Sequence, residues 1–387
     1  MKTKFTDFLY RKTTSSAFVP EVDGFRFFAI FTVLLYHLNT HFTSVIAPLV
    51  DELYYKSSLT FLAMREGGIG VNVFFAISGF ILALPFARQH LVGATPVNLK
   101  SYFIRRLTRL EPPYVISLLL FLGVHVIILH KNFQDIFPNF LASLFYVHNI
   151  VFNEWSVINP VAWSLEVEVQ FYVLAPLLAF VFAIPNTKWR RAVIVMVIVS
   201  GMLHYNLNYE WIKDWHLRKS LFMHLHQFFI GFLMADIFLV NWKSQTQQKN
   251  FWWDAIGIIA MTSLLIWNEP FYIKHDLIFG LALLLAFVSV FKGQLLNRFY
   301  THPAIVIIGG MCYTIYLLHY AAIAFLTGKS MVLFQPAWSY AANYFLQAIL
   351  IIPVVLLVSA VFFVLIERPC MDKDWPAKVK AKILSVF

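Results

Sequence analysis

Charged residues are scarce in this chain. Asp, Glu, Lys and Arg make up 13% of its 387 positions, whereas a soluble domain carries about 25% because its surface must face water. Hydrophobic residues make up 60% of the positions. Most of the surface is therefore expected to face lipid, which argues against a soluble enzyme or binding module. The predicted fold class is all-α, a polytopic bundle of transmembrane helices.

Cysteine is also scarce. Cys312 and Cys370 are too few for a disulfide framework, and their spacing does not match a metal site. We therefore expect no metal centre and no tightly bound cofactor. The net charge of +10 could suggest a nucleic-acid partner. However, no basic stripe alternates with stacking aromatic residues, so no nucleic acid is expected to bind.

Ten apolar segments approach the length needed to cross a hydrocarbon core of about 30 Å. They lie at 27–46, 69–86, 112–130, 161–184, 192–207, 221–240, 254–268, 276–291, 303–326 and 343–366. The stretch 136–152 is apolar too, but Pro138, His148 and Asn149 favour an interfacial or re-entrant segment. If it crossed the membrane, every later segment would be inverted.

The distribution of basic residues predicts the orientation. With ten spans and a cytoplasmic N-terminus, the inside segments hold 21 Lys and Arg and the outside loops hold 8. This asymmetry follows the positive-inside rule and predicts that both termini are cytoplasmic. The first span lacks a small-residue cleavage pattern, so it is interpreted as a permanent helix. The chain is predicted to form one membrane domain over 1–387, without a fused extracytoplasmic domain.

Polar residues within the first span are candidates for function, because burying them in hydrocarbon is unfavourable. Arg26 and His37 are separated by close to three helical turns and should share a face, with His41 one turn further on. At 1.5 Å per residue, His37 lies about 16 Å from Arg26, near the bilayer midplane. A histidine there could also simply bond to a neighbouring helix.

The fourth span carries two acidic residues, Glu166 and Glu168. Glu168 should lie about 10 Å deep, at a height similar to that of His37. A carboxylate beside an imidazole fixes its tautomer and raises its basicity. Glu166 points about 200° away around the helix, so the two acids cannot serve one site equally. A packed, protonated Glu168 is the alternative interpretation.

A basic cluster directly precedes the third span. Arg105, Arg106 and Arg109 occupy positions that meet on one helical face, and guanidinium groups match phosphate oxygens. The cluster would suit a nucleotide-bearing donor such as coenzyme A, although any cytoplasmic loop collects arginines.

The segment 67–80, which opens and fills the second span, is rich in small residues, and these indicate close helix packing, with Ser78 as a packing residue. No Gly-x-Ser-x-Gly motif surrounds a serine, so a serine-hydrolase mechanism has no support.

Taken together and in order, six elements resemble the acyltransferase-3 family of bacterial membrane O-acyltransferases, over nearly the whole chain. They are Asp23-Gly24-Phe25-Arg26 with His37, the segment 70–80, the arginine-rich segment 105–112, Trp163-Ser164-Leu165 through Glu168 followed by 170–172, the segment 313–319, and Glu367-Arg368-Pro369. Three positions depart from the family pattern: Glu166, where the family usually has a small or apolar residue, Val169, where an acid is common, and Leu318, which replaces a frequent Trp.

The resemblance implies transfer of an acetyl or another short acyl group from cytoplasmic acyl-CoA to a hydroxyl of a cell-envelope glycan such as lipopolysaccharide or of a related lipid-linked acceptor. It implies a bacterial inner-membrane protein in which His37 is the catalytic histidine and Arg26 and Glu168 support it. The implied donor-binding residues are Arg105, Arg106 and Arg109. The candidates for the substrate side are His319, Trp163, Ser164 and Tyr172.

Two questions stay open at this level. His37 could act as a general base on the acceptor hydroxyl or carry the acyl group transiently. Intramembrane His and Glu residues also build proton relays, so a proton-coupled transporter or flippase is the alternative function. Transporters often contain internal repeats, and none is found between the two halves of this chain.

Overall fold

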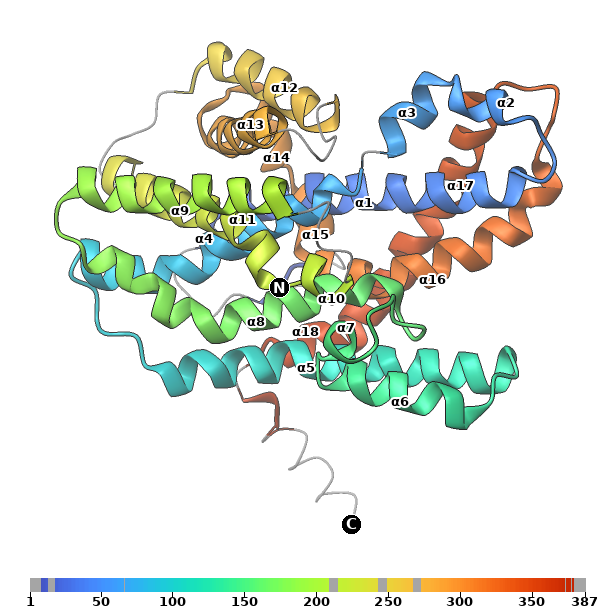
Figure 1. Ribbon diagram of the computed structural model, residues 1–387, viewed down its shortest axis with the longest axis horizontal. Coiled ribbons are helices and arrows are strands. Elements are labelled where there is room, and N and C mark those ends of the chain that lie inside the picture. The colour runs from blue at the N-terminus through green and yellow to red at the C-terminus, as the bar shows by residue number, and fades with distance from the viewer. Residues whose placement is uncertain are drawn as a thin grey trace, which may run out of the picture.

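The computed structural model describes residues 8–12, 18–65, 67–208, 215–242, 249–266, 273–372, 374–376 and 378. Within these residues the regular structure is helical and no strand occurs, which confirms the predicted all-α class. The helix α1 (Pro20–Ile46) packs against α4 (Ile69–Leu91) and against α16 (Cys312–Ser330) and α17 (Tyr340–Phe362), which are far from it in the sequence (Figure 1). The short helices α2 (Glu52–Lys56), α10 (Trp215–Arg218) and α14 (Leu295–Tyr300) connect longer helices.

Seven helical runs in the described part of the chain are long and apolar enough to cross a membrane. They are α1; Leu59–Leu91, with α3 (Leu59–Arg65) and α4 (Ile69–Leu91); Leu99–Ile128, with α5 (Leu99–Gly123) and η2 (Val124–Ile128); Pro160–Ala183, with η3 (Pro160–Ala162), α8 (Trp163–Leu178) and η4 (Ala179–Ala183); Leu221–Trp242, with α11 (Leu221–Ile237) and η5 (Phe238–Trp242); Cys312–Leu333, with α16 (Cys312–Ser330) and η6 (Met331–Leu333); and Tyr340–Cys370, with α17 (Tyr340–Phe362), η7 (Phe363–Glu367) and α18 (Arg368–Cys370).

The predicted total of ten spans is not confirmed, because three predicted spans fall outside this set. They correspond to α9 (Thr187–Asn208), α12 (Phe251–Ile266) and α13 (Ile273–Lys292). α12 has 16 residues, fewer than the roughly 20 needed for a full crossing. The end of the predicted span 254–268 lies outside the described residues, as do both chain ends, 1–7 and 379–387, whose cytoplasmic placement is predicted.

The third predicted span begins earlier than the sequence indicated. α5 starts at Leu99 and continues through Pro112 and Pro113, although proline removes a backbone donor and normally breaks a helix. The carbonyl of Thr108, four residues before Pro112, accepts a hydrogen bond from the indole Nε1 of Trp375 at 2.8 Å. A side chain from elsewhere in the chain therefore bonds the carbonyl that the proline leaves free, as tolerated prolines require.

The predicted span 303–326 is divided into two helices, α15 (Pro303–Gly310) and α16. Two consecutive glycines end α15, and α16 begins after Met311. A Cβ on Gly309 would lie 1.8 Å from the carbonyl oxygen of Asp23, so α15 contacts the backbone of α1 directly. This break allows α15 and α16 to pack on α1 in different directions (Figure 1).

The apolar stretch 136–152 forms α6 (Phe133–Leu144) and the one-turn helix α7 (His148–Val151). α6 has 12 residues, which is too short to cross a membrane. The hydroxyl of Tyr114 on α5 donates to the carbonyl of Ser143 at 2.8 Å. This bond holds α6 beside α5.

Glycines allow α4 and α11 to cross in close contact, as the small residues of the second span predicted. A Cβ on Gly79 would lie 2.1 Å from the carbonyl oxygen of Phe228, and one on Gly231 would lie 2.1 Å from that of Ala76. Each helix therefore presents a glycine to the backbone of the other. Such small-residue contacts are typical of helix pairs in membranes.

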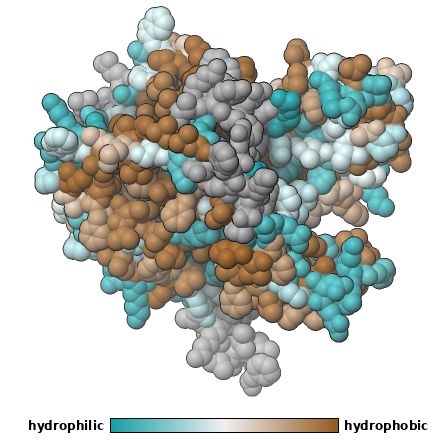
Figure 2. Space-filling view, in the orientation of Figure 1, coloured by the Kyte–Doolittle hydropathy of each residue, from teal (hydrophilic) through white to brown (hydrophobic). Residues whose placement is uncertain are grey.

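Large apolar side chains are exposed along several of the long helices. On α8 and η4 they include Val173, Leu177 and Phe180, which are 60–65% exposed. Figure 2 shows broad hydrophobic areas on the visible face, with hydrophilic residues gathered mainly toward its edges. Extended apolar surface of this kind indicates contact with lipid or with another protein.

Candidate functional site

The main cavity lies among α1, α4, α5, α8 and α16, and the segment before α1 also contributes to its wall. Its volume is about 770 Å³. The charged residues that line it are Arg11, Lys12, Arg26, Arg88, Arg105, Arg106, Arg109 and Glu168. Glu168 is the one carboxylate among these described lining residues. A concave site with such an excess of cations attracts and concentrates an anionic ligand.

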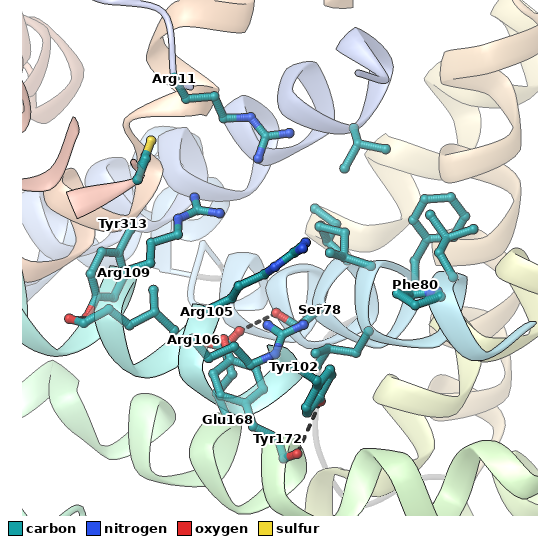
Figure 3. Close-up of a pocket in the computed structure, with 18 of the residues that line it drawn as sticks. Arg11, Ser78, Phe80, Tyr102, Arg105, Arg106, Arg109, Glu168, Tyr172 and Tyr313 are labelled. Atoms are coloured by element: carbon teal, nitrogen blue, oxygen red, sulfur yellow. Dashed lines mark hydrogen bonds between the residues drawn. The ribbon is translucent and has the colours of Figure 1, made fainter. Parts of the chain in front are cut away.

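The predicted arginine cluster is brought together on one side of this cavity. Arg105, Arg106 and Arg109 extend from consecutive turns of α5 into the cavity (Figure 3). The guanidinium carbon of Arg106 lies 4.6 Å from the ring centroid of Tyr102 and 4.8 Å from that of Tyr172. These cation–π contacts restrict where the guanidinium can point. The Nε atoms of Arg106 and Arg109 are buried and have no hydrogen-bond partner in the described structure, so they can donate to a ligand.

An ion-pair network joins the first span to the segment before it. Asp23 accepts from the Nε of Arg11 at 2.5 Å and from a terminal nitrogen of Arg26 at 2.8 Å. Burial and the neighbouring Arg26 lower the pKa of Arg11 to about 10, so Arg11 is still charged at neutral pH. The predicted residue Arg26 therefore lies in the wall of the cavity, fixed by Asp23.

Sequence reasoning missed three of the cations, namely Arg11, Lys12 and Arg88. Arg88 lies three residues after Pro85, in the last turn of α4. It lines the same cavity as the arginines of α5 because of the way α4 packs on α5. Arg11 and Lys12 lie outside every predicted span. The one signal for Arg11 was the acidic residue Asp23 close to Arg26, which required a partner if it was buried.

Glu168 lies in the cavity wall and accepts a hydrogen bond from the hydroxyl of Ser78 (Figure 3). Among the contacts of the described residues, none joins Glu168 to His37, so the predicted pairing of these two side chains is not found. The helical rise predicted only the height of each residue along its helix. It did not fix the rotation of α8, which turns Glu168 toward α4 and α5. Ser78 thus has a partner in the site as well as a place in helix packing.

Glu166 serves a different part of the molecule. Its side chain is 1% exposed, and it accepts from the backbone N–H of Asn149 at 2.9 Å. It therefore fixes α7 against the start of α8. The expectation that the two acids of α8 cannot share one site is confirmed by these separate partners.

His37 lies in a group of aromatic rings formed by α1 and α16. Its ring centroid is 5.0 Å from that of His319 and 5.2 Å from that of Tyr320. His41 contacts the same Tyr320, with centroids 4.6 Å apart, which confirms that His37 and His41 share a face. The Nδ1 atom of His37 is buried and has no partner among the described residues.

The other predicted substrate-side residues are Trp163, Ser164 and Tyr172. The hydroxyl of Tyr316 donates to the carbonyl of Val161 at 2.7 Å, so the hydroxyl of Ser164 donates to Tyr316 at 2.6 Å. Ser164 and Tyr172 line the cavity, whereas Trp163 does not. The ring centroid of Trp163 lies 3.9 Å from the ammonium of Lys219.

Within the described residues, no group of three or more His, Cys, Asp and Glu side chains could hold a metal ion. Cys312 and Cys370 are both free thiols, and both line the cavity.

Comparison with known proteins identifies the family. The model of the acyltransferase-3 family, described as an acyltransferase domain, matches residues 19–364. The O-acetyltransferase OatA of Staphylococcus aureus is 25% identical over 401 residues, which cover 95% of this chain and 59% of that relative. A protein of the same species, strain COL, provisionally named as an O-acetyltransferase, is 24% identical over 344 residues, covering 82% of this chain and 52% of its own length.

The chain thus spans somewhat more than half the length of these relatives. No solved structure matches it. The family match covers far more than half of the chain and includes α1, the arginines of α5, the start of α8 and α16. The chain therefore belongs to the acyltransferase-3 family.

Proposed function

We propose that this chain is a membrane O-acetyltransferase. It takes an acetyl group from acetyl-CoA, bound from the cytoplasmic side in the arginine cavity, and transfers it to a hydroxyl of a cell-envelope glycan or related acceptor. The observation that carries the proposal is the cavity of about 770 Å³ with seven basic side chains and one carboxylate in its wall. The names of the relatives, which are O-acetyltransferases of a bacterium, support the acetyl group.

The donor end of the cavity suits a polyphosphate. Arginine forks bind phosphate oxygens in pairs. The Nε atoms of Arg88, Arg106 and Arg109 are buried and have no partner in the part of the chain that the structure describes. A buried donor that lacks a partner is unfavourable by about 1–3 kcal/mol. Phosphate groups of the donor would satisfy these atoms, which favours binding of coenzyme A over that of a neutral ligand.

His37 acts as the general base in the proposed reaction. Its imidazole takes the proton from the acceptor hydroxyl while the hydroxyl oxygen attacks the thioester carbonyl. The carbon–sulfur bond then breaks, and the proton on the imidazolium passes to the departing thiolate of coenzyme A. General-base catalysis of this kind contributes typically 10²–10⁴-fold. Glu168 keeps Ser78 in place at the wall of the donor cavity.

We also propose that α9, α12 and α13 cross the membrane, which gives ten spans and two cytoplasmic termini. α9 has 22 residues and α13 has 20, lengths that reach about 30 Å at 1.5 Å per residue. α12 packs against α13, and α9 packs against α11. The excess of Lys and Arg on the inner side of this topology supports the orientation. Labelling of single cysteines placed in the loops would test it, and a label that reached both sides of α9 equally would contradict it.

Acetyl-CoA binding to the purified protein tests the donor site. Wild type should bind acetyl-CoA in isothermal titration calorimetry, whereas a variant with Arg105, Arg106 and Arg109 replaced by Gln should bind at least 100-fold more weakly. Charged hydrogen bonds contribute about 1.5–3 kcal/mol each. Lys100→Gln is the matched control, because Lys100 is an exposed cation on the same helix outside the cavity.

The outcomes separate the two candidate functions. Equal binding by wild type and the triple variant would remove the cavity as the donor site. If wild type did not bind acetyl-CoA at all, the acyltransferase proposal would fail, and proton-coupled transport would be measured next in proteoliposomes under a pH gradient.

A further inference from the structure

The side chain of His319 is held in one tautomer by its own helix. Its Nδ1 lies 3.1 Å from the carbonyl oxygen of Ile315 and 2.9 Å from that of Tyr316. Carbonyl oxygens only accept hydrogen bonds, so Nδ1 carries the proton and Nε2 of the neutral ring carries the lone pair. His319 is fully buried, which keeps water from competing for these bonds.

That lone pair has no partner among the described residues. The Nε2 of His319 is buried and unpaired, and so is the Nδ1 of His37. The two ring centroids are 5.0 Å apart, a separation at which a small rotation of either ring brings these two nitrogens within direct hydrogen-bond distance. Since the Nε2 of His319 can only accept, the Nδ1 of His37 must supply the hydrogen. Two unpaired buried atoms, each unfavourable by about 1–3 kcal/mol, are then satisfied together.

We infer that His319 is a positioning residue that holds His37 in the Nδ1–H tautomer. The Nε2 of His37 then carries the lone pair with which it removes the proton from the acceptor. This inference rests on the proposed function, because it assigns the partner of the base in that reaction. It also gives His37 the orienting neighbour that Glu168 does not supply. Tyr36 and Tyr320 contact His37 through their rings, and neither forms a hydrogen bond with its Nδ1 in the described structure.

His319 also connects the base to the donor cavity. The same Tyr316 whose carbonyl accepts from His319 lines the cavity with its ring and bonds Ser164 through its hydroxyl. One turn of α16 therefore positions both the wall of the donor site and the partner of His37. A base that carries its proton on the wrong nitrogen loses most of its activity without losing substrate binding.

Nitrogen-15 NMR of histidine side chains tests the inference without any need for turnover. The protein is studied in lipid nanodiscs, and the His37 signals are identified by their loss in His37→Ala. Wild type should show His37 protonated at Nδ1, and His319→Leu should shift it toward protonation at Nε2, the form that free imidazole side chains prefer. His90→Leu, at an exposed histidine of α4, should leave the His37 signals unchanged. An Nε2-protonated His37 in wild type, or one that does not respond to His319→Leu, would overturn the inference.

Kinetics provides the second measurement. His319→Leu should lower kcat by at least about 100-fold, in line with general-base contributions, while the KM for acetyl-CoA stays within about twofold. His319→Gln, whose amide oxygen can accept from His37, should recover part of the lost kcat. A fall in acetyl-CoA affinity equal to the fall in kcat would show a merely structural role and refute the inference. If the tautomer depends on His319 but wild type transfers no acetyl group, the positioning contact stands and the proposed function fails.

Discussion

The crossing of α4 and α11 gives a stability prediction with a built-in control. In Gly231→Ala, the new Cβ would lie 2.1 Å from the carbonyl oxygen of Ala76 and 2.4 Å from the amide nitrogen of Phe80. Both are backbone atoms, so no side chain can rotate away to make room. The two helices must separate by about 1 Å to restore ordinary contact.

The expected magnitude follows from two opposing effects. Inserting one methyl group into a tightly packed contact is unfavourable by about 1–3 kcal/mol. Alanine favours a helix over glycine by about 1 kcal/mol, which offsets part of this. Gly231→Ala should therefore destabilise the protein by up to about 2 kcal/mol. Gly328, in α16, has no atom within 4 Å of the position that a Cβ would occupy. Gly328→Ala should therefore stabilise by about 1 kcal/mol.

Thermal unfolding in one detergent, followed by tryptophan fluorescence, compares the two variants with wild type. The melting temperature should fall for Gly231→Ala and rise for Gly328→Ala. Because α4 also carries Ser78, the partner of Glu168, Gly231→Ala should weaken acetyl-CoA binding too. Equal stability changes in the two variants would refute the close contact of α4 with α11.

Three further substitutions test the donor site and its supports. Arg109→Gln should weaken acetyl-CoA binding by about 10–150-fold, equivalent to about 1.5–3 kcal/mol for a charged hydrogen bond, and Arg109→Lys should recover only part of it. Asp23→Asn should destabilise the protein by about 3–5 kcal/mol in thermal unfolding, because Arg11 and Arg26 lose their buried counterion. Trp375→Phe should lower the melting temperature, because it leaves the carbonyl of Thr108 on α5 without its partner. The expected loss in the free energy of unfolding is about 1–3 kcal/mol.

Each of these substitutions has a clear contradicting result. Arg109→Lys binding as tightly as wild type would mean that charge alone matters at that position. Asp23→Asn should be compared with Glu52→Gln, which removes an exposed ion pair with Lys56 and should change stability by less than about 1 kcal/mol. Similar losses in the two variants would contradict a buried network. An unchanged melting temperature for Trp375→Phe would show that water can replace the indole.

The sequence predicted the helical class because apolarity and segment length are local properties. The predicted helix bounds were wrong where a residue distant in the sequence changes the local structure. Pro112 indicated a helix start, but Trp375 bonds the carbonyl that this proline frees, and α5 continues through it. The single predicted span 303–326 became two helices, because Gly309 packs on the backbone of α1.

The part of the candidate site that depends on residue spacing along a single helix was predictable from the sequence. Arg105, Arg106 and Arg109 follow from helical geometry and do line one cavity. The partner of His37 was not predictable in this way, because rotation of α8 about its axis cannot be derived from depth. The contribution of Arg11 likewise depends on its position relative to Asp23 and Arg26 of α1, which the sequence pattern does not predict.

The most direct test of the account is acetyl transfer by His37→Ala. Wild type and the variant, purified in nanodiscs, are supplied with acetyl-CoA labelled in the acetyl group and with cell-envelope glycans isolated from the organism that makes the protein. The label on the glycan is then measured after alkaline release. The account predicts that wild type labels the glycan, while His37→Ala binds acetyl-CoA with wild-type affinity and transfers at least 100-fold less, as expected for loss of a general base. Transfer at the wild-type rate by His37→Ala would contradict it.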